Sequence, residues 1–163
     1  MTHQGFTTYR ILCVPANGLE AETAAFHLAV AQFAEDITIP AGILFAVASL
    51  PSGADALANR HGIESNLRTC DFFIQIFGSG TLNPLYGAFV RLALECQADP
   101  GRPMRRVAVC FQDANDAPSN ELRELRAGFA DRRDVHGFRD TGDLATAIRA
   151  IFQVWYEEVK ARP

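Results

Sequence analysis

The residue with the clearest capacity for chemistry is Glu95, a carboxylate inside a predicted helix. It stands in the stretch DFFIQIFGSGTLNPLYGAFVRLALECQAD, residues 71–99, which runs from an apolar strand through a glycine-containing loop into that helix. A carboxylate at the rim of a ligand pocket serves as an acid, a base or a nucleophile. The alternative is a charge on a helix boundary, paired with Arg91 one turn earlier and worth roughly a few tenths of a kcal/mol. Both interpretations stay open on this stretch alone.

The glycine-containing turns argue against the common phosphate-binding loops. The first strand-to-helix turn reads VPANGLEAE, with one glycine and two acids, and is a poor cradle for an anion. The segment GSGTLN, residues 78–83, lacks the third glycine of a dinucleotide fingerprint, so a tight turn is the better interpretation. The sequence contains no G-x-x-x-x-G-K-[ST] and no G-x-S-x-G, which excludes the P-loop and the nucleophile elbow. The strand before GSGTLN also ends without the carboxylate of a phospho-receiver domain.

Neither the histidines nor the cysteines have the spacing of a metal site. We expect surface or half-buried rings for the four histidines, His3, His27, His61 and His136. The cysteines form no C-x-x-C and lie in or beside apolar runs, at Cys13, Cys70, Cys96 and Cys110. This pattern predicts buried thiols in a reducing cytosol rather than a disulfide framework. We therefore expect no metal and no cofactor.

The composition fits one globular domain, because 48% of the 163 residues are hydrophobic and 21% are charged. We expect residues 1–163 to form a single α/β domain, with residues 1–8 as a loose N-terminal tail.

The formal net charge of −4 gives no basic surface, which disfavours nucleic acid and favours a small-molecule or protein partner. The opening MTHQGFTTYR has no apolar core of a signal peptide, and no apolar run approaches the roughly 18 residues of a membrane span. The expectation is a cytoplasmic protein without a membrane partner.

Apolar strand-like runs alternate with helix-like segments along the chain. The runs are continuous, which indicates strands buried on both faces, as in a parallel sheet between helices. Five β–α units predict a three-layer, doubly wound α/β sandwich with a five-stranded, mainly parallel sheet of the flavodoxin-like kind. The predicted strands are 9–16, 41–49, 72–78, 105–112 and 135–139, the last at an edge. The predicted helices are 19–36, 53–70, one from Pro84 onward, 119–132 and 144–160.

The last helix has the strongest pattern. Its apolar positions fall on one face at helical spacing, at Leu144, Ile148, Ile151, Phe152, Trp155 and Val159. Asp140 or Thr141 is placed to cap its start by accepting backbone hydrogen bonds.

In an open parallel sheet, ligands bind beyond the carboxyl ends of the strands, where strand order reverses. This rule points to the loops 15–18, 49–53, 78–86 and 112–116. These loops contain the candidate positions Asn17, Gly78, Ser79, Asn83 and Tyr86.

The helix after Pro84 is apolar on two sides. Its core-facing stripe is predicted to be Leu85, Ala88, Phe89, Leu92, Ala93 and Cys96, which sets Glu95 roughly a right angle away. Val90 and Leu94 lie opposite that stripe. Because such a flank is unusual at a free surface, we expect it to meet a second protomer or a protein partner.

Three segments together resemble the TIR-like, nucleoside 2-deoxyribosyltransferase-like superfamily. RILCVPANGLEAETAAFHLAV resembles its opening strand and helix, IESNLRTCDFFIQIFG its amphipathic helix and central strand, and LALECQAD its leucine-glutamate-tyrosine step. The resemblance is closest to a branch of unknown function, found at the N-terminus of NTPase and repeat-containing signalling proteins. It covers roughly residues 9–112 and adds a TIR-like fold to the expectations.

The resemblance implies chemistry at an N-glycosidic bond of NAD or a nucleoside. In enzymatic relatives a glutamate on the helix after the central strand stabilises or traps the positive centre at ribose C1′, and here that residue is Glu95. Asn17, Ser79, Asn83 and Tyr86 would line the sugar or base by hydrogen bonding and stacking. The chain departs from the family at Thr23, where an arginine is expected, and in the first loop, which lacks the hydroxyl pair. The alternative function is a non-catalytic signalling or assembly module that self-associates or binds a protein partner.

Overall fold

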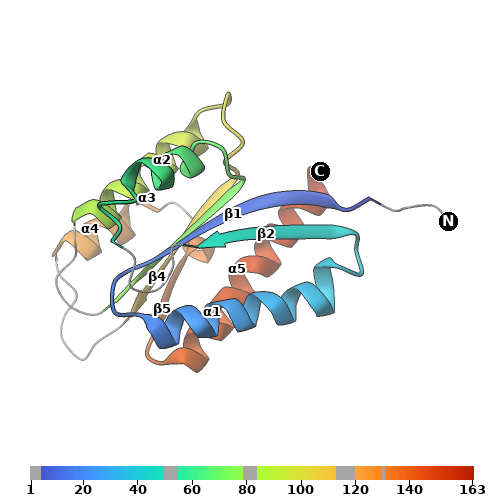
Figure 1. The fold of residues 1–163 in the computed structure, drawn as a ribbon, viewed down its shortest axis with the longest axis horizontal. Coiled ribbons are helices and arrows are strands. Elements are labelled where there is room, and N and C mark those ends of the chain that lie inside the picture. Colours follow the sequence, from blue (N-terminus) through green and yellow to red (C-terminus); the bar gives the residue numbers. More distant parts are fainter. Residues whose placement is uncertain (1–4, 50–54, 79–83, 113–119, 130) are drawn as a thin grey trace.

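The computed structural model of this chain describes residues 5–49, 55–78, 84–112, 120–129 and 131–163, and shows an α/β sandwich (Figure 1). The five strands are β1 (Thr7–Pro15), β2 (Ile43–Ser49), β3 (Phe72–Phe77), β4 (Arg106–Gln112) and β5 (Val135–Phe138). The helices are α1 (Glu20–Phe33), α2 (Arg60–Leu67), α3 (Pro84–Ala98), α4 (Asn120–Ala127) and α5 (Thr141–Ala161). Two short turns, the π-helical η1 (Ala34–Thr38) and the 3-10 turn η2 (Arg132–Asp134), follow α1 and α4.

The strands form one sheet in the order β2-β1-β3-β4-β5, and every pairing is parallel. This is the strand order of flavodoxin-like folds. The predicted α/β class, the parallel sheet and the edge position of residues 135–139 are therefore confirmed. Within the described residues, no helix has the length and apolar character needed to cross a membrane.

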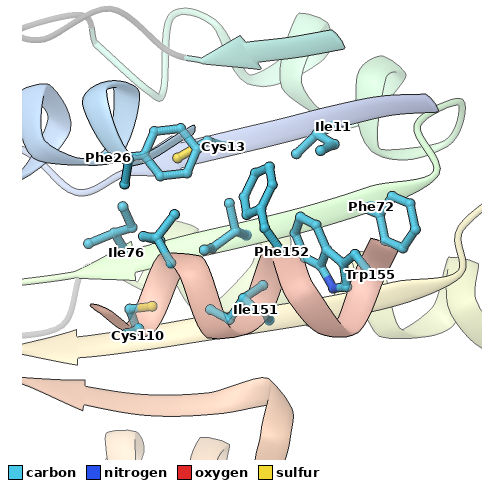
Figure 2. Packing of buried hydrophobic residues seen from close by; sticks show 14 of the residues in the cluster. Ile11, Cys13, Phe26, Phe72, Ile76, Cys110, Ile151, Phe152 and Trp155 are labelled. Carbon is cyan, nitrogen blue, oxygen red and sulfur yellow. The ribbon is translucent and has the colours of Figure 1, made fainter. Parts of the chain in front are cut away.

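The α1 and α5 layer covers one face of the sheet with a largely aromatic core. Phe72 of β3 and Trp155 of α5 stack at 4.7 Å between ring centroids, and Phe152 lies 5.1 Å from Trp155. Figure 2 shows Ile151, Phe152 and Trp155 projecting from α5 toward the strands that carry Ile11, Cys13 and Ile76. The apolar stripe predicted for α5 is buried as expected, and Asp140 caps the helix by accepting from the backbone amide of Asp143 at 2.8 Å.

The second face of the sheet is covered by α2, α3 and α4. Its core is built from β1, β3 and β4 residues of the opposite parity, such as Leu12, Phe73 and Val109, together with Phe89 of α3. The four cysteines are buried, free thiols, two in each core cluster, which confirms the prediction made from their apolar surroundings.

Several boundaries differ from the sequence predictions; for example, α4 was predicted over 119–132 but ends at Ala127. Strand β1 begins at Thr7, whose amide donates to Gly42 at 3.0 Å, so residues 7 and 8 belong to the sheet and not to a tail. Helix α2 has eight residues, where a helix over 53–70 was predicted. The backbone before it turns instead, because the Asp55 carboxylate accepts from the amide of Leu57 and Asn59 donates to the Asp55 carbonyl.

Candidate functional site

The strand order of the sheet changes direction between β1 and β3, and this switch point predicts the position of a ligand crevice. β2 lies on one side of β1, whereas β3, β4 and β5 follow in turn on the other side. The amide of Ala16 donates to the carbonyl of Ile76 at 2.9 Å, so the two strands stay paired to their carboxyl ends. In folds with this strand order, ligands bind beyond those ends at the β1/β3 switch point.

The loop after β1 turns sharply into α1. Asn17 is exposed, and Gly18 takes a φ of 80°, a left-handed conformation that favours glycine. Thr23 fastens the start of the helix, because its hydroxyl donates to the carbonyl of Leu19 at 2.7 Å. The loop therefore presents the polar Asn17 at the edge and turns the apolar Leu19 inward.

Gly78, directly after β3, packs closely against this loop. A Cβ at position 78 would lie 3.3 Å from Cδ2 of Leu19 and 3.9 Å from Oε1 of Gln112. The parallel pairing of β1, β3 and β4 places their carboxyl ends together at this edge. The rest of its loop, including the predicted site residues Ser79 and Asn83, lies outside the described residues.

Tyr86, in the first turn of α3, reaches the same edge from the α3 side. The side chain is buried, with 3% of the residue exposed, and its hydroxyl has no hydrogen-bond partner among the described residues. Burial raises the pKa of the Tyr86 hydroxyl, the backbone amide of Asn17 opposes the shift, and the Asp55 carboxylate adds to it. The Asn17 amide therefore faces the hydroxyl without completing an ordinary hydrogen bond.

The burial of Tyr86 corrects one predicted role. Its ring packs edge to face against Phe89, with 6.4 Å between centroids and 67° between planes. A ring buried in this way cannot stack on a nucleobase, so Tyr86 offers a ligand its hydroxyl alone.

Gln75 is a polar residue of this region that the sequence reasoning missed. It is fully buried in β3, where its side-chain nitrogen donates to the carbonyls of Val14 at 2.6 Å and Ile76 at 3.3 Å. Its Oε1 atom is buried and has no partner among the described residues. The signal was present in the sequence, since Gln75 is the single polar residue of the run FFIQIF.

Glu95 does not join these residues. It is exposed in the last turns of α3, eleven residues beyond Pro84, which corresponds to roughly 16 Å along a helix axis. The same end of α3 borders the start of β4, where Gln97 donates to the carbonyl of Arg105 at 3.1 Å. Glu95 therefore lies toward the amino edge of the sheet, opposite the edge that carries Asn17, Gly78 and Tyr86.

The predicted orientation of α3 is confirmed only in part, because Phe89, Ala93 and Cys96 are buried as expected whereas Leu85, Ala88 and Leu92 are half-buried. Val90 is completely buried in the core of the α2–α3 face and Leu94 is half-buried against it, so this flank is not a free surface for a second protomer. The helix packs against both the sheet and α2, which turns Tyr86, Phe89, Val90 and Ala93 inward. With this buried face, Glu95 points about 170° away from the core, toward solvent. The described structure contains no ion pair between Glu95 and Arg91, both of which are exposed.

A serine and a histidine meet at the end of β2, a contact that the sequence did not indicate. The Ser49 hydroxyl lies 3.0 Å from Nε2 of His27, which projects from α1. A nucleophilic serine also needs a group that orients its histidine. Among the described residues nothing is hydrogen-bonded to the second ring nitrogen of His27, so the contact fastens α1 to β2. Among all the residues that the structure describes, no cluster of three His, Cys, Asp or Glu residues could hold a metal ion.

No protein-family model matches the chain, and no curated protein matches it. Among solved structures, the chain is similar to one described as the crystal structure of the RPS4 and RRS1 TIR domain heterodimer. That match has 15% sequence identity, covers 90% of this chain and 99% of the other, and has a TM-score of 0.49. A likeness at this level carries no conclusion about function. The flavodoxin-like fold is established by the strand order itself.

Proposed function

We propose that this chain is a nucleoside- or nucleotide-binding domain whose ligand lies at the carboxyl ends of β1 and β3. The observation that supports this function is the buried Tyr86 hydroxyl, which has no partner among the described residues and lies beside the Asn17 amide. Leaving a buried hydroxyl unsatisfied costs about 1–3 kcal/mol. A ligand that accepts a hydrogen bond from Tyr86 would recover that free energy.

The polar groups at this edge suit a sugar. The Tyr86 hydroxyl and the Asn17 amide are hydrogen-bond donors, and the nearby Asp55 carboxylate is an acceptor. The hydroxyls of a ribose both donate and accept, so one sugar can satisfy groups of both kinds. Phosphate is a poorer occupant, because Glu20 and Glu22 place negative charge in the first turn of α1. The proposed contacts are therefore to the nucleoside part of a ligand.

Binding is tested by titration calorimetry with adenosine, other nucleosides and NAD. We expect Tyr86→Phe to weaken binding at least tenfold, because it removes the hydroxyl and keeps the ring. Tyr156→Phe is the matched control, since Tyr156 lies on α5, across the sheet from this site. Absence of binding by the unmodified protein, or equal affinity in both variants, would contradict the proposal.

The proposal leaves Glu95 outside the binding site, and a second assay examines that point. Nucleobase release from NAD and from nucleosides is measured for the unmodified protein, for Glu95→Ala and for Glu157→Ala, an exposed helix glutamate on α5. We expect the three proteins to behave alike. Release that is lost only in Glu95→Ala would make Glu95 a catalytic residue and would move the ligand away from the β1/β3 edge.

A further inference from the structure

The free edge of β2 lacks the features that usually keep a sheet edge from pairing with another chain. β2 stands at one end of the strand order and pairs only with β1 among the described residues (Figure 1). Its sequence ILFAVAS contains no charged residue and no proline, and its register with β1 is unbroken from Ile43 to Ser49. Native edge strands are ordinarily blunted by charges, by proline or by bulges. An unprotected seven-residue edge suggests that another strand covers it.

The side chains of β2 alternate between a covered face and an open one. Phe45 and Val47 pair with β1 residues that face α1 and α5. Leu44, Ala46 and Ala48 face the other way, toward the side of α2, and Leu44 keeps 39% of its surface exposed. Helix α2 has only eight residues, and hollows separate it from β2 on this face.

Small side chains leave room beside β2 on this open face. Two hollows of about 170 Å³ each lie between β2 and α2, and both are lined by Leu12, Ala48 and Asn66. Ala46 lines one of them, and Gly62 of α2 lines the other. On the open face of β2, the Leu44 side chain therefore protrudes, whereas Ala46 and Ala48 border the hollows.

We propose that β2 pairs with β2 of a second copy of this chain, antiparallel about a two-fold axis at Ala46. In this register Leu44 faces Ala48 of the second copy, and Ala46 faces its own equivalent. Directly opposed residues of an antiparallel pair have Cβ atoms about 4.5–5.5 Å apart, so the leucine of each copy enters the hollow above the alanine of the other. The two sheets join into one of ten strands.

The occupant is a second copy because β2 complements itself. Its large and small residues lie at equal distances from Ala46, so a two-fold pairing sets each large side chain against a small one. On the other face Phe45 meets Val47 of the second copy, and Ile43 meets Ser49. None of the facing pairs brings two charges together. The inference does not depend on the ligand site, which involves the ends of β1 and β3.

The dimer should be weak. Pairing of one seven-residue strand gives an interface at the small end of the range for specific complexes, so we expect a dissociation constant of about 10–100 μM. Sedimentation equilibrium over concentrations on both sides of this range should show a shift from one chain to two. A protein that stays monomeric throughout would overturn the proposal.

A charged substitution on the edge locates the interface. We expect Leu44→Lys to weaken dimerisation at least tenfold, because it places an ammonium group against Ala48 of the second copy. Leu28→Lys is the matched control, since Leu28 is an exposed leucine on the solvent side of α1, at 60% exposure. Both positions are exposed in the monomer, so both variants should keep the circular dichroism spectrum of the unmodified protein. Equal dimerisation in the two variants would rule out the β2 edge.

The register is tested by disulfide cross-linking and by exchanging the large and the small side chain of a facing pair. Ala46→Cys should form a disulfide-linked dimer in oxidised glutathione, because the residue faces its own equivalent and the four native cysteines are buried. Ala31→Cys, exposed on α1, is the control and should not. Ala48→Leu alone should weaken the dimer by filling the hollow, and adding Leu44→Ala should restore it to within threefold. Equal cross-linking in both cysteine variants, or no rescue in the double variant, would overturn this register.

Discussion

The two faces of this sheet are built on different scales. On one face, α1 has 14 residues and α5 has 21, and between them lie the stacked rings of Phe72 and Trp155. On the other face, α2 and α4 have eight residues each, and only α3 is long. Hollows lined by described residues open on that second face, between α3 and α4 with a volume of about 450 Å³ and between β2 and α2.

This difference indicates that one face contributes mainly stability and the other mainly binding surfaces. Long helices with a continuous aromatic layer bury much apolar area per residue, and that burial is the main source of stability. Short helices bury less and leave strand edges and helix grooves open, which is where binding surfaces occur. The α1–α5 face should therefore dominate stability, and the α2–α4 face should tolerate change at its margins.

The largest effect expected from this comparison is that of Trp155→Ala. The substitution removes a fully buried indole from the stack on Phe72 and should lower the free energy of unfolding by about 3–5 kcal/mol. Urea titration followed by circular dichroism measures it. Trp155→Phe is the control, because it keeps a ring in the stack and removes an indole N–H that has no partner among the described residues, so it should cost much less. Equal losses in the two variants would mean that the stack is not the source of the stability.

A smaller effect is expected on the other face, and it distinguishes the centre of that face from its margin. Val90→Ala should cost about 2 kcal/mol, because Val90 is fully buried. Leu94→Ala should cost less, although it removes more atoms, because Leu94 is half-buried beside the hollow between α3 and α4. Denaturant titrations of both variants give the order. The reverse order would place Val90 at the margin and weaken the comparison.

A network at the amino edge of the sheet ties the two faces together, and it should respond to acid. Arg106 of β4 binds Asp131 at 2.8 Å and Asp134 at 2.9 Å after α4, and approaches Glu158 of α5 at 3.9 Å. Hydrogen bonds from Arg133 and Arg106 hold the pKa of Asp131 below its ordinary value of 3.8. A lowered folded-state pKa contributes stability that is present above pH 3.8 and is lost as the pH falls below it.

Asp131→Asn should therefore flatten the fall of the melting temperature in acid, with Asp36→Asn, on an exposed turn, as the control. The pKa of Asp134 is shifted in the opposite direction, because burial raises it while Arg106 opposes the shift. Its protonation partly offsets the loss from Asp131. An unchanged acid slope in Asp131→Asn would show that the ionised Asp131 carboxylate does not stabilise the folded state.

The smallest stability effect is expected for Tyr86→Phe, at the ligand edge of the second face. Removing a buried hydroxyl that lacks a partner among the described residues should leave the free energy of unfolding unchanged or raise it by up to about 1 kcal/mol. Thermal melts without ligand measure it. A clear loss of stability would mean that the hydroxyl is satisfied by bound water and not kept available for a ligand.

Most of the fold followed from the sequence, and the errors have physical causes. The continuous apolar strands and the one-sided stripe of α5 predicted a parallel sheet between helices, because each pattern fits one environment. Helix α3 was misjudged because it is apolar over most of its circumference, so periodicity could not show that Val90 faces inward. The length of α2 depended on the local hydrogen bonds of Asp55, which compete with helix formation.

The candidate site was only partly predictable. Asn17, Gly78 and Tyr86 follow from the rule that ligands bind beyond strand carboxyl ends, and the structure brings them to one edge. Glu95 was selected by its residue type and by resemblance, neither of which measures how far along a helix a residue lies. Strand order, which defines the switch point, depends on long-range pairing that no local pattern records.

The position of Trp155 has an optical consequence. It is the only tryptophan among the 163 residues, and it is fully buried between α5 and β3. Intrinsic indole emission from this protein therefore reports on the α1–α5 side alone. Loosening of α2 or α4 would hardly change the indole emission, whereas far-ultraviolet circular dichroism would detect it. A difference between the two signals would show that the two layers do not melt together.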